Sequence, residues 1–595
     1  MDSGGERDDR ADSAKGSPRS LSERLTHVRL PDFVQYLGED IVRSHRIEKW
    51  IFPLLLLISV LYLFTGIEIG LNVYDEGLSV YGATRVLNGE VPYRDFWTIY
   101  APGQFYVLAL LFHLFGSSIM VERVFSGTIH FLIVLCIYWH ARKLVSWKLA
   151  LLAWFLGLLW VGSFGFFANP TPPAILLSLL SYFCLIDFFY KKRERSLWLA
   201  GMFSGAVLLF RHDLGLYSFL SETASVILFA YVGPLKGLAK RGAGFVRTLN
   251  VYIGYVMGTI IIVLPVAVFF LSHVPVHEII SDLITFPVKT FPEFRSLPYP
   301  DPIPDPLPII LGKESVFQFL SAGLERFPFY FPMVVFVMAV LFAIAGFLNK
   351  RKLPGPQWAE VALVLIGIIF FNQARVRSDT AHLLPTMVFA IILFPSLLSG
   401  HLPHSKPIHD RLIVRVFLYF FAFCALVSFG YHSLYAPGRN LFASFSPTHL
   451  IPLDLSRARG IYMDARQAED LERAVKFIQR HVPGKEKIFV GHSRHDLIFA
   501  NDIMFYFLSE RDSATKYHEL HTGLATTHRI QQEVIHDLER EKVNYVVLWN
   551  DPENNIEPNK SKESSGVKDL DDFIQSHYET VTNFGPYTIL KKELL

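Results

Sequence analysis

The sequence predicts a mainly α-helical, polytopic membrane protein of about eleven transmembrane helices with a C-terminal α/β domain. Apolar residues make up 51% of the 595 residues and charged residues 18%, against about 25% charged in a typical soluble domain. Apolar runs long enough to cross a bilayer recur along residues 50–434, whereas residues 435–595 alternate between helical and strand patterns. The three cysteines all lie in apolar runs, which excludes a disulfide framework.

The N-terminal segment, residues 1–49, is expected to be a cytoplasmic tail followed by a surface helix. Residues 1–20 are rich in Asp, Ser, Gly and Arg and have no apolar core, which indicates a disordered tail and not a cleavable signal peptide. The first apolar run, 50–69, then predicts an uncleaved signal anchor that leaves the N-terminus in the cytoplasm.

Eleven runs meet or approach the roughly 20 residues that a transmembrane helix needs. Residues Pro102–Phe115 are apolar but number only 14, which favours a helix at the membrane interface. With this run left out of the count, Lys and Arg concentrate in the cytoplasmic loops. The predicted spans are 50–69, 119–140, 147–167, 172–190, 196–210, 214–232, 249–271, 328–348, 358–372, 383–400 and 411–434, in a membrane of the bacterial inner type.

Three segments are then expected outside: the first outer loop 70–118, the loop 272–327 and the tail 435–595. The middle one contains a proline run from Pro298 to Pro308, which predicts an extended, mobile loop. The tail predicts a small α/β domain. Its expected helices are 465–481, 530–541 and 568–577, and its expected strands are 487–490, 543–549 and 587–590.

The sharpest chemical signal is the pair Asp75-Glu76, directly after the first span. A helix of about ten residues follows, so Asp75 is a candidate for its N-cap. Two adjacent carboxylates repel each other, which raises a pKa, and a carboxylate held there can accept a proton from an attacking hydroxyl. From the dipeptide alone, a simple helix cap is the alternative interpretation.

This first outer loop resembles that of the GT-C superfamily of integral-membrane glycosyltransferases, in the branch of protein O-mannosyltransferases and bacterial aminoarabinose transferase. The resemblance covers about residues 50–145 and extends to the number and layout of the remaining spans. The branch usually has Lys-Pro-Pro where this chain has Tyr100-Ala101-Pro102, so that lysine's phosphate contact is not carried over. The matching elements are Asp75-Glu76, the helix ending at Gly89, Pro92-Tyr93, Pro102-Gly103, Leu114-Phe115-Gly116 and Arg123.

The resemblance implies transfer of a sugar from a polyprenyl-phosphate donor to a lipid, glycan or protein acceptor outside the cytoplasm. Asp75 would be the catalytic carboxylate with Glu76 beside it. The surrounding residues Tyr93, Arg94, Asp95 and Arg123 would bind substrate.

A lipid phosphate leaving group needs cations at the outer membrane boundary. Arg211 lies between the fifth and sixth spans there, and Arg375, Arg377 and His382 lie between the ninth and tenth. Arg binds phosphate bidentately, although anchoring to lipid headgroups would use the same residues. Lys289, Arg295 and Lys313 in the loop 272–327 are further candidates for phosphate binding.

Two other classes of function remain open at this point. A transporter or flippase is one, although no internal repeat is present and the ionisable groups gather at the outer rim. A non-catalytic scaffold for envelope assembly is the other. No cofactor is certain, a divalent metal is possible without a predicted ligand set, and no basic field indicates nucleic acid.

Overall fold

The computed structural model describes residues 46–231, 243–313, 315–348, 355–399, 412–435, 449–550 and 557–593. The chain divides into two compact units, residues 1–55 and 56–595, and the contacts given below all lie within the second. Residues 1–45, which contain the predicted tail and most of the predicted surface helix, fall outside the described residues.

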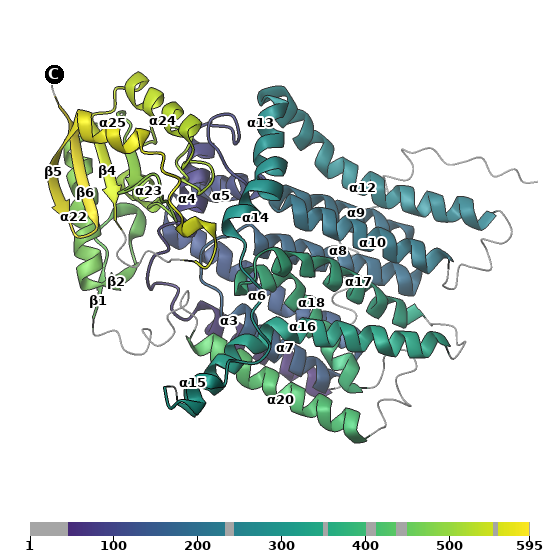
Figure 1. Ribbon diagram of the computed structural model, residues 1–595. Coiled ribbons are helices and arrows are strands. Elements are labelled where there is room, and N and C mark those ends of the chain that lie inside the picture. The colour runs from purple at the N-terminus through teal and green to yellow at the C-terminus, as the bar shows by residue number, and fades with distance from the viewer. Residues whose placement is uncertain are drawn as a thin grey trace, which may run out of the picture. The chain divides into compact units, whose positions relative to one another are not determined.

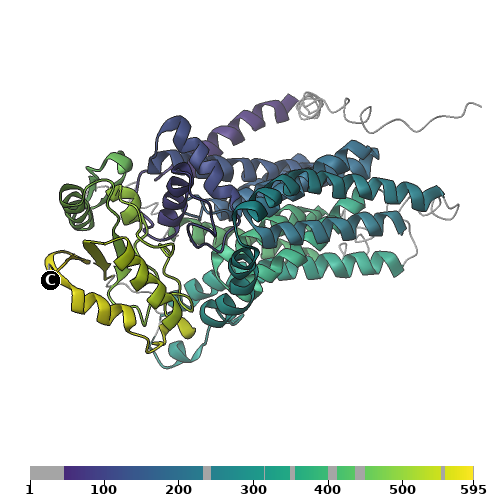
Figure 2. The same ribbon diagram turned by 90° about the horizontal axis from the view of Figure 1, so that it is seen from above.

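Each predicted span coincides with a helix, and the long helices from α6 onward run alongside one another in Figures 1 and 2. Seven helices in the described part are long and apolar enough to cross a membrane, which makes the chain a mainly α-helical, multi-pass membrane protein. These seven are α6 (Ile119–Leu144), α8 (Thr171–Lys191), α12 (Ala243–His273), α16 (Val316–Leu348), α17 (Gly355–Val376), α18 (Thr380–Ser399) and α20 (Leu412–Tyr435). The other four predicted spans are α3 (Arg46–Phe64), α7 (Trp147–Val161), α9 (Glu194–Phe210) and α10 (His212–Tyr231).

Two short helices form the segment between the first two spans: α4 (Asp75–Leu87) and α5 (Gly103–Phe115). With 13 residues, α5 is too short to cross a bilayer, in keeping with the prediction that it is not a span. A Cβ at Gly103 would lie 2.6 Å from the carbonyl oxygen of Leu209, near the end of α9. Glycine therefore lets the start of α5 pack directly against the residues that precede Arg211.

The loop 272–327 is more ordered than the sequence predicts. Residues 276–295 form a continuous helical segment made of α13 (Val276–Ile280), a π-helix (Ser281–Thr290) and α14 (Phe291–Arg295). The proline run is extended, as expected, except for the single turn α15 (Leu307–Ile310), after which α16 begins twelve residues before its predicted start. The helical part matters for function because it carries Arg295 to the site described below.

The tail is an α/β unit, as predicted, and its sheet is drawn in yellow and green in Figure 1. The strand order is β3-β4-β6-β5, with β3 and β4 parallel and the remaining pairs antiparallel. The strands of this sheet are β3 (Phe489–His492), β4 (Tyr545–Trp549), β5 (Tyr578–Phe584) and β6 (Tyr587–Lys592). Two short strands that the sequence does not predict, β1 (Leu450–Pro452) and β2 (Tyr462–Asp464), form a separate antiparallel pair. The helices are α22 (Ala465–His481), α23 (Met504–Ser509), α24 (His528–Arg540) and α25 (Asp569–His577). The sequence misses β5 because this edge strand is mostly exposed and its polar residues give no apolar alternation.

The tail shares a hydrophobic core with the first outer segment. Buried Leu78 and Tyr81 of α4 belong to the same cluster as Phe507 of α23, and the Tyr81 ring stacks on that of Tyr506 at 4.9 Å. A Cβ at Gly77 would collide with the backbone nitrogen of Met504, so only glycine admits this approach. The tail thereby holds the helix that begins with Asp75.

Candidate functional site

Asp75 is the first residue of α4, but its side chain does not cap the helix. The side chain of Asn72 does so, since its Oδ1 accepts hydrogen bonds from the backbone N–H groups of Tyr74 at 3.2 Å and Asp75 at 2.8 Å. The predicted N-cap role of Asp75 is therefore wrong. Because Asn72 supplies the capping oxygen, the Asp75 carboxylate, which accepts from Asn72 Nδ2 at 3.3 Å, is left for other chemistry.

The Asp75 carboxyl group is half-buried, and burial raises its pKa above the ordinary value. The hydrogen bond from Asn72 and the charges of Arg295 and Arg377 oppose this, while the charge of Asp379 adds to it. The main cause of this rise in pKa is burial, and not the repulsion between adjacent carboxylates expected from the sequence. Asp75 lies within electrostatic reach of cations from distant parts of the chain.

Glu76 points into the protein and is 1% exposed. The Arg123 guanidinium donates to both of its oxygens, at 2.6 and 2.9 Å, and also to the carbonyl of Gly70 at 2.7 Å. This bidentate pair ties the end of the first span to α4 and α6. In this geometry Glu76 and Arg123 position the outer segment, and the substrate contact that the resemblance implies for Arg123 has no free guanidinium edge to make it.

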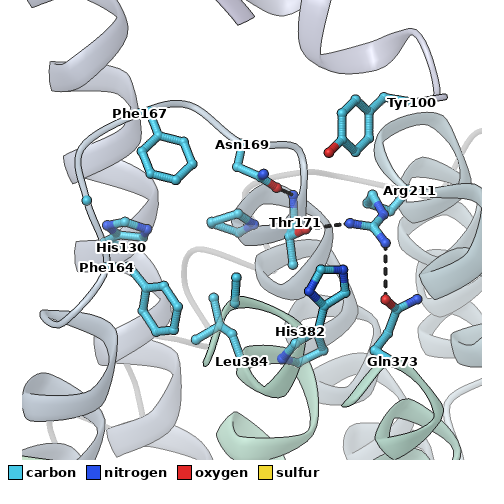
Figure 3. Close-up of a pocket in the computed structure, with 14 residues that line it drawn as sticks. Tyr100, His130, Phe164, Phe167, Asn169, Thr171, Arg211, Gln373, His382 and Leu384 are labelled. Carbon is cyan, nitrogen blue, oxygen red and sulfur yellow. Dashed lines mark hydrogen bonds between the residues drawn. The ribbon is translucent and has the colours of Figure 1, made fainter. Parts of the chain in front are cut away.

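A cavity of about 70 Å³ opens beside these elements (Figure 3). This volume is several times the roughly 10–15 Å³ that one water molecule needs, so a group the size of a phosphate can enter. One side of the cavity is apolar, with Phe164, Phe167 and Leu384. Between Phe164 and Phe167 the imidazole of His130 also lines the cavity (Figure 3). The cavity brings together two of the predicted phosphate-binding residues, Arg211 and His382. The rest of its polar lining comes from Tyr100, Asn169, Thr171 and Gln373.

Arg211 lies at the junction of α9 and α10, where its partners hold the guanidinium plane in one orientation. Two of its nitrogens donate to the Asp213 carboxylate at 3.0 and 2.7 Å, and its Nη1 donates to the Thr171 hydroxyl at 2.8 Å. The Gln373 side chain accepts a weaker bond at 3.3 Å. An arginine fixed in this way is preorganised for an oxyanion in the cavity.

His382 is held by a carboxylate in the same manner. Its Nδ1 lies 2.8 Å from Asp379 Oδ1, which also accepts from the His382 backbone N–H. Burial opposes ionisation of Asp379, but His382 and Arg377 outweigh it and hold the pKa of this carboxyl below its usual range. The pairing fixes the imidazole at the cavity wall (Figure 3).

Tyr100 connects the cavity with Asp75. The Arg211 guanidinium lies over the Tyr100 ring, 5.9 Å from its centroid. Burial raises the pKa of Tyr100, and the nearby charge of Asp75 raises it further while Arg211 lowers it. Asp75 and Arg211, which are 136 positions apart in the sequence, therefore act on the same side chain.

Arg377 and Arg375 have different surroundings from those predicted. Arg377 is 8% exposed and donates to Asp379 at 2.7 Å and to Glu557 of the tail at 2.9 Å, while Arg295 also pairs with Glu557 at 3.6 Å. Arg375 is exposed and donates to Asn372 at 3.0 Å. Neither arginine lines the cavity, but Arg377 lies directly behind His382, because both pair with Asp379.

Residues Tyr93, Arg94 and Asp95 form a turn that supports Tyr100. Tyr93 is 2% exposed and adopts a left-handed conformation with φ of 69°, and its hydroxyl donates to the Tyr100 carbonyl at 2.8 Å. Asp95 accepts from the backbone N–H of Val91 at 2.7 Å and from Arg94 at 2.7 Å. These contacts assign the turn a supporting role, where the resemblance implies substrate contacts.

Several residues of the site are not predicted from the sequence, among them Thr171, Gln373 and Glu519. The Tyr74 hydroxyl donates to Glu519 Oε1 at 2.8 Å across 445 positions of sequence. No local pattern signals such a contact. Within the described ranges, no group of three or more His, Cys, Asp or Glu side chains is arranged to hold a metal ion.

No family model and no curated protein matches this sequence. Solved structures are similar in fold. The apo oligosaccharyltransferase of Archaeoglobus fulgidus shares 12% identity and a TM-score of 0.50 over 85% of this chain and 70% of its own. ArnT from Cupriavidus metallidurans bound to undecaprenyl phosphate shares 11% identity and a TM-score of 0.49 over 92% and 98%. The arabinofuranosyltransferase AftD from Mycobacteria shares 14% identity and a TM-score of 0.44 over 93% and 40%.

Because the sequence identities are so low, the structural similarity establishes the fold alone. It rests on the oligosaccharyltransferase, for which the TM-score is 0.50. The helices at the eleven predicted spans, the two short helices between the first two spans and the C-terminal α/β unit therefore share the fold of that oligosaccharyltransferase.

Proposed function

We propose that the chain is a membrane glycosyltransferase that moves a sugar from a polyprenyl-phosphate-linked donor to an acceptor hydroxyl, with Asp75 as the general base. The observation that carries this proposal is a cavity that brings Arg211, His382 and Thr171 together with aromatic and aliphatic side chains. Asp75 does not line this cavity, but its charge raises the pKa of the lining residue Tyr100, over whose ring Arg211 lies. A fold similar to that of an oligosaccharyltransferase is in keeping with sugar transfer.

The donor's phosphate would bind in the cavity between Arg211, Thr171 and His382. Its isoprenoid chain would contact the apolar side, where Phe164 and Leu384 lie. Asp213 keeps the guanidinium of Arg211 oriented, so little reorganisation is needed when negative charge develops on the leaving phosphate.

In the reaction, the acceptor hydroxyl would give its proton to an Asp75 carboxylate oxygen. The hydroxyl oxygen would form a bond to the anomeric carbon as the bond from that carbon to the phosphate oxygen breaks. The electron pair of the broken bond would leave with the lipid phosphate, whose charge Arg211 stabilises. Half-burial raises the pKa of Asp75 and so makes it a better proton acceptor than an exposed aspartate.

The other predicted residues would act around this centre. Glu76 and Arg123 would fix the start of α4, and Arg377 would fix the end of α17 to the tail. The exposed Arg375 suits contact with lipid headgroups. The positive-inside pattern supports an N-terminus in the cytoplasm and the site on the opposite face, in a membrane of the bacterial inner type.

The test is release of lipid phosphate from a panel of labelled polyprenyl-phosphate sugars by the purified full-length protein. We expect release with at least one donor, and Asp75→Asn should lower the turnover number by about 100-fold or more while leaving the thermal unfolding transition in place. Asp454→Asn, on the exposed surface of the tail, is the matched control. Equal turnover by wild type and Asp75→Asn would refute the role of Asp75, and lipid movement without phosphate release would favour a transporter.

A further inference from the structure

Glu519 is a buried acid that the tail brings to the first outer segment. It is 2% exposed, its Oε1 accepts the hydrogen bond from the Tyr74 hydroxyl at 2.8 Å, and its Oε2 has no hydrogen-bond partner among the described residues. A buried carboxylate with one oxygen unsatisfied is costly if it serves only packing. Because Glu519 contacts Tyr74, the residue directly before Asp75, its burial calls for a functional explanation.

The segment that carries Glu519 is fixed by the tail itself. The Asn501 side chain accepts from the Leu520 backbone N–H at 3.0 Å and donates to the His518 carbonyl at 2.9 Å. The chain on both sides of Glu519 is thus tied to one buried side chain. Glu519 is placed by this frame and not by its bond to Tyr74.

Several titratable groups surround Glu519. Burial raises its pKa to about 8, and the charges of Asp75 and Asp282 add to the rise, while the bond from Tyr74 and the charge of Arg295 lower it. Its neighbours His518 and His521 are themselves buried, and burial lowers the pKa of both, so they contribute no charge near neutral pH. The groups that act on Glu519 are Tyr74, which precedes α4, Asp75 of α4, Asp282 of the π-helix, Arg295 of α14 and Tyr100.

We propose that Glu519 is a positioning residue of the Asp75 site, which orients the start of α4 through Tyr74 and whose charge state sets the affinity of the site for an anionic lipid phosphate. This inference rests on the proposed function and deepens it, because it assigns the tail a part in donor binding. Protonated Glu519 adds nothing to the negative charge that Asp75 and Asp282 bring. Ionised Glu519 adds one further negative charge, which repels the phosphate.

The direction of the pH effect follows from these signs. Below about pH 8 Glu519 holds its proton and the donor binds. As the pH rises through that value, a unit charge appears in a partly buried site, which weakens binding of an anion by on the order of tenfold. Loss of the Tyr74 hydrogen bond should move this transition to higher pH, because that bond favours the ionised form.

The experiment measures binding of polyprenyl phosphate to the full-length protein between pH 6 and pH 10, together with KM for the donor. We expect wild-type affinity to fall on the order of tenfold on the alkaline side, Glu519→Gln to abolish this fall and Tyr74→Phe to shift it upward in pH. The matched control is Asp502→Asn, which removes another buried tail acid that accepts from a tyrosine, Tyr587, at 2.7 Å and has a pKa raised by burial to about 7.

Two results would overturn the inference: an unchanged alkaline fall in Glu519→Gln, or an equal loss of the fall in Asp502→Asn. A wild type that binds the lipid phosphate with the expected pH dependence but transfers no sugar would refute the proposed function and leave Glu519's role intact. A wild type that binds no lipid phosphate would refute both.

Discussion

Replacing Arg211 by lysine tests the phosphate end of the site while keeping the positive charge. Arg211 donates two hydrogen bonds to Asp213 and one to Thr171, and lysine cannot reproduce this planar arrangement. If the transition-state phosphate gains one bidentate contact from Arg211, its loss removes two charge-assisted hydrogen bonds of about 1.5 kcal/mol each. The resulting 3 kcal/mol or so corresponds to a fall in kcat/KM of about 100-fold.

The assay is phosphate release under single-turnover conditions, which separates chemistry from product dissociation. The control is Arg375→Lys, on an exposed arginine of the same outer rim that does not line the cavity. We expect the control to change kcat/KM by less than about threefold, since exposed ion contacts are worth about 0–1 kcal/mol. A fall of under fivefold for Arg211→Lys, with unfolding unchanged, would refute the assignment of the phosphate to this cavity.

Two further predictions concern the attachment of the tail. Gly77→Ala should lower the free energy of unfolding by about 1–3 kcal/mol, because the new Cβ would collide with the backbone of Met504. The control Gly323→Ala, in a helix with open space around this position, should be neutral or stabilising. Thermal unfolding measures both variants, and equal effects would contradict the close approach of Gly77 to Met504. Glu557→Gln should lower the free energy of unfolding by about 2 kcal/mol, because Arg295 and Arg377, both partly buried, lose a charged partner. The control Glu293→Gln, in an exposed ion pair, should lower it by less than about 0.5 kcal/mol. Similar shifts in the midpoint of unfolding for the two variants would refute this role of Glu557.

The helices could be predicted because hydropathy and length act locally. A run of about 20 apolar residues has few alternatives to a membrane helix, and the 13 residues of α5 are too few. The helical segment 276–295 could not be predicted in the same way, because its residues mix charge and apolar character and its order depends on packing. Phe286, for example, packs edge-on against Trp97 at 5.0 Å, a contact that no local pattern specifies.

Part of the site could be predicted because its signal is also local in the sequence. Asp75 stands out because a carboxylate directly after a span is conspicuous, but its neighbour Glu76 looks equivalent in sequence and differs only in direction. One helical position, about 100° of rotation, turns Glu76 into the protein toward Arg123 and leaves Asp75 at the site. Glu519 gives no such signal, since its proximity to Tyr74 depends on the tail's fold.

The charges of the site explain why its arginines are positioned before any ligand arrives. Arg211 is paired with Asp213, and Arg377 with Asp379 and Glu557, so each buried guanidinium is neutralised within the protein. An unpaired buried cation would be costly, and it would bind any anion at the membrane surface. Pairing lowers that cost and keeps the guanidinium rigid. A lipid phosphate bound as proposed would have to replace the contacts of Arg211 with Thr171 and Gln373, two neutral side chains that line the cavity. On the proposed function, selectivity for a phosphate of the right shape would therefore follow from the same acids that neutralise the arginines.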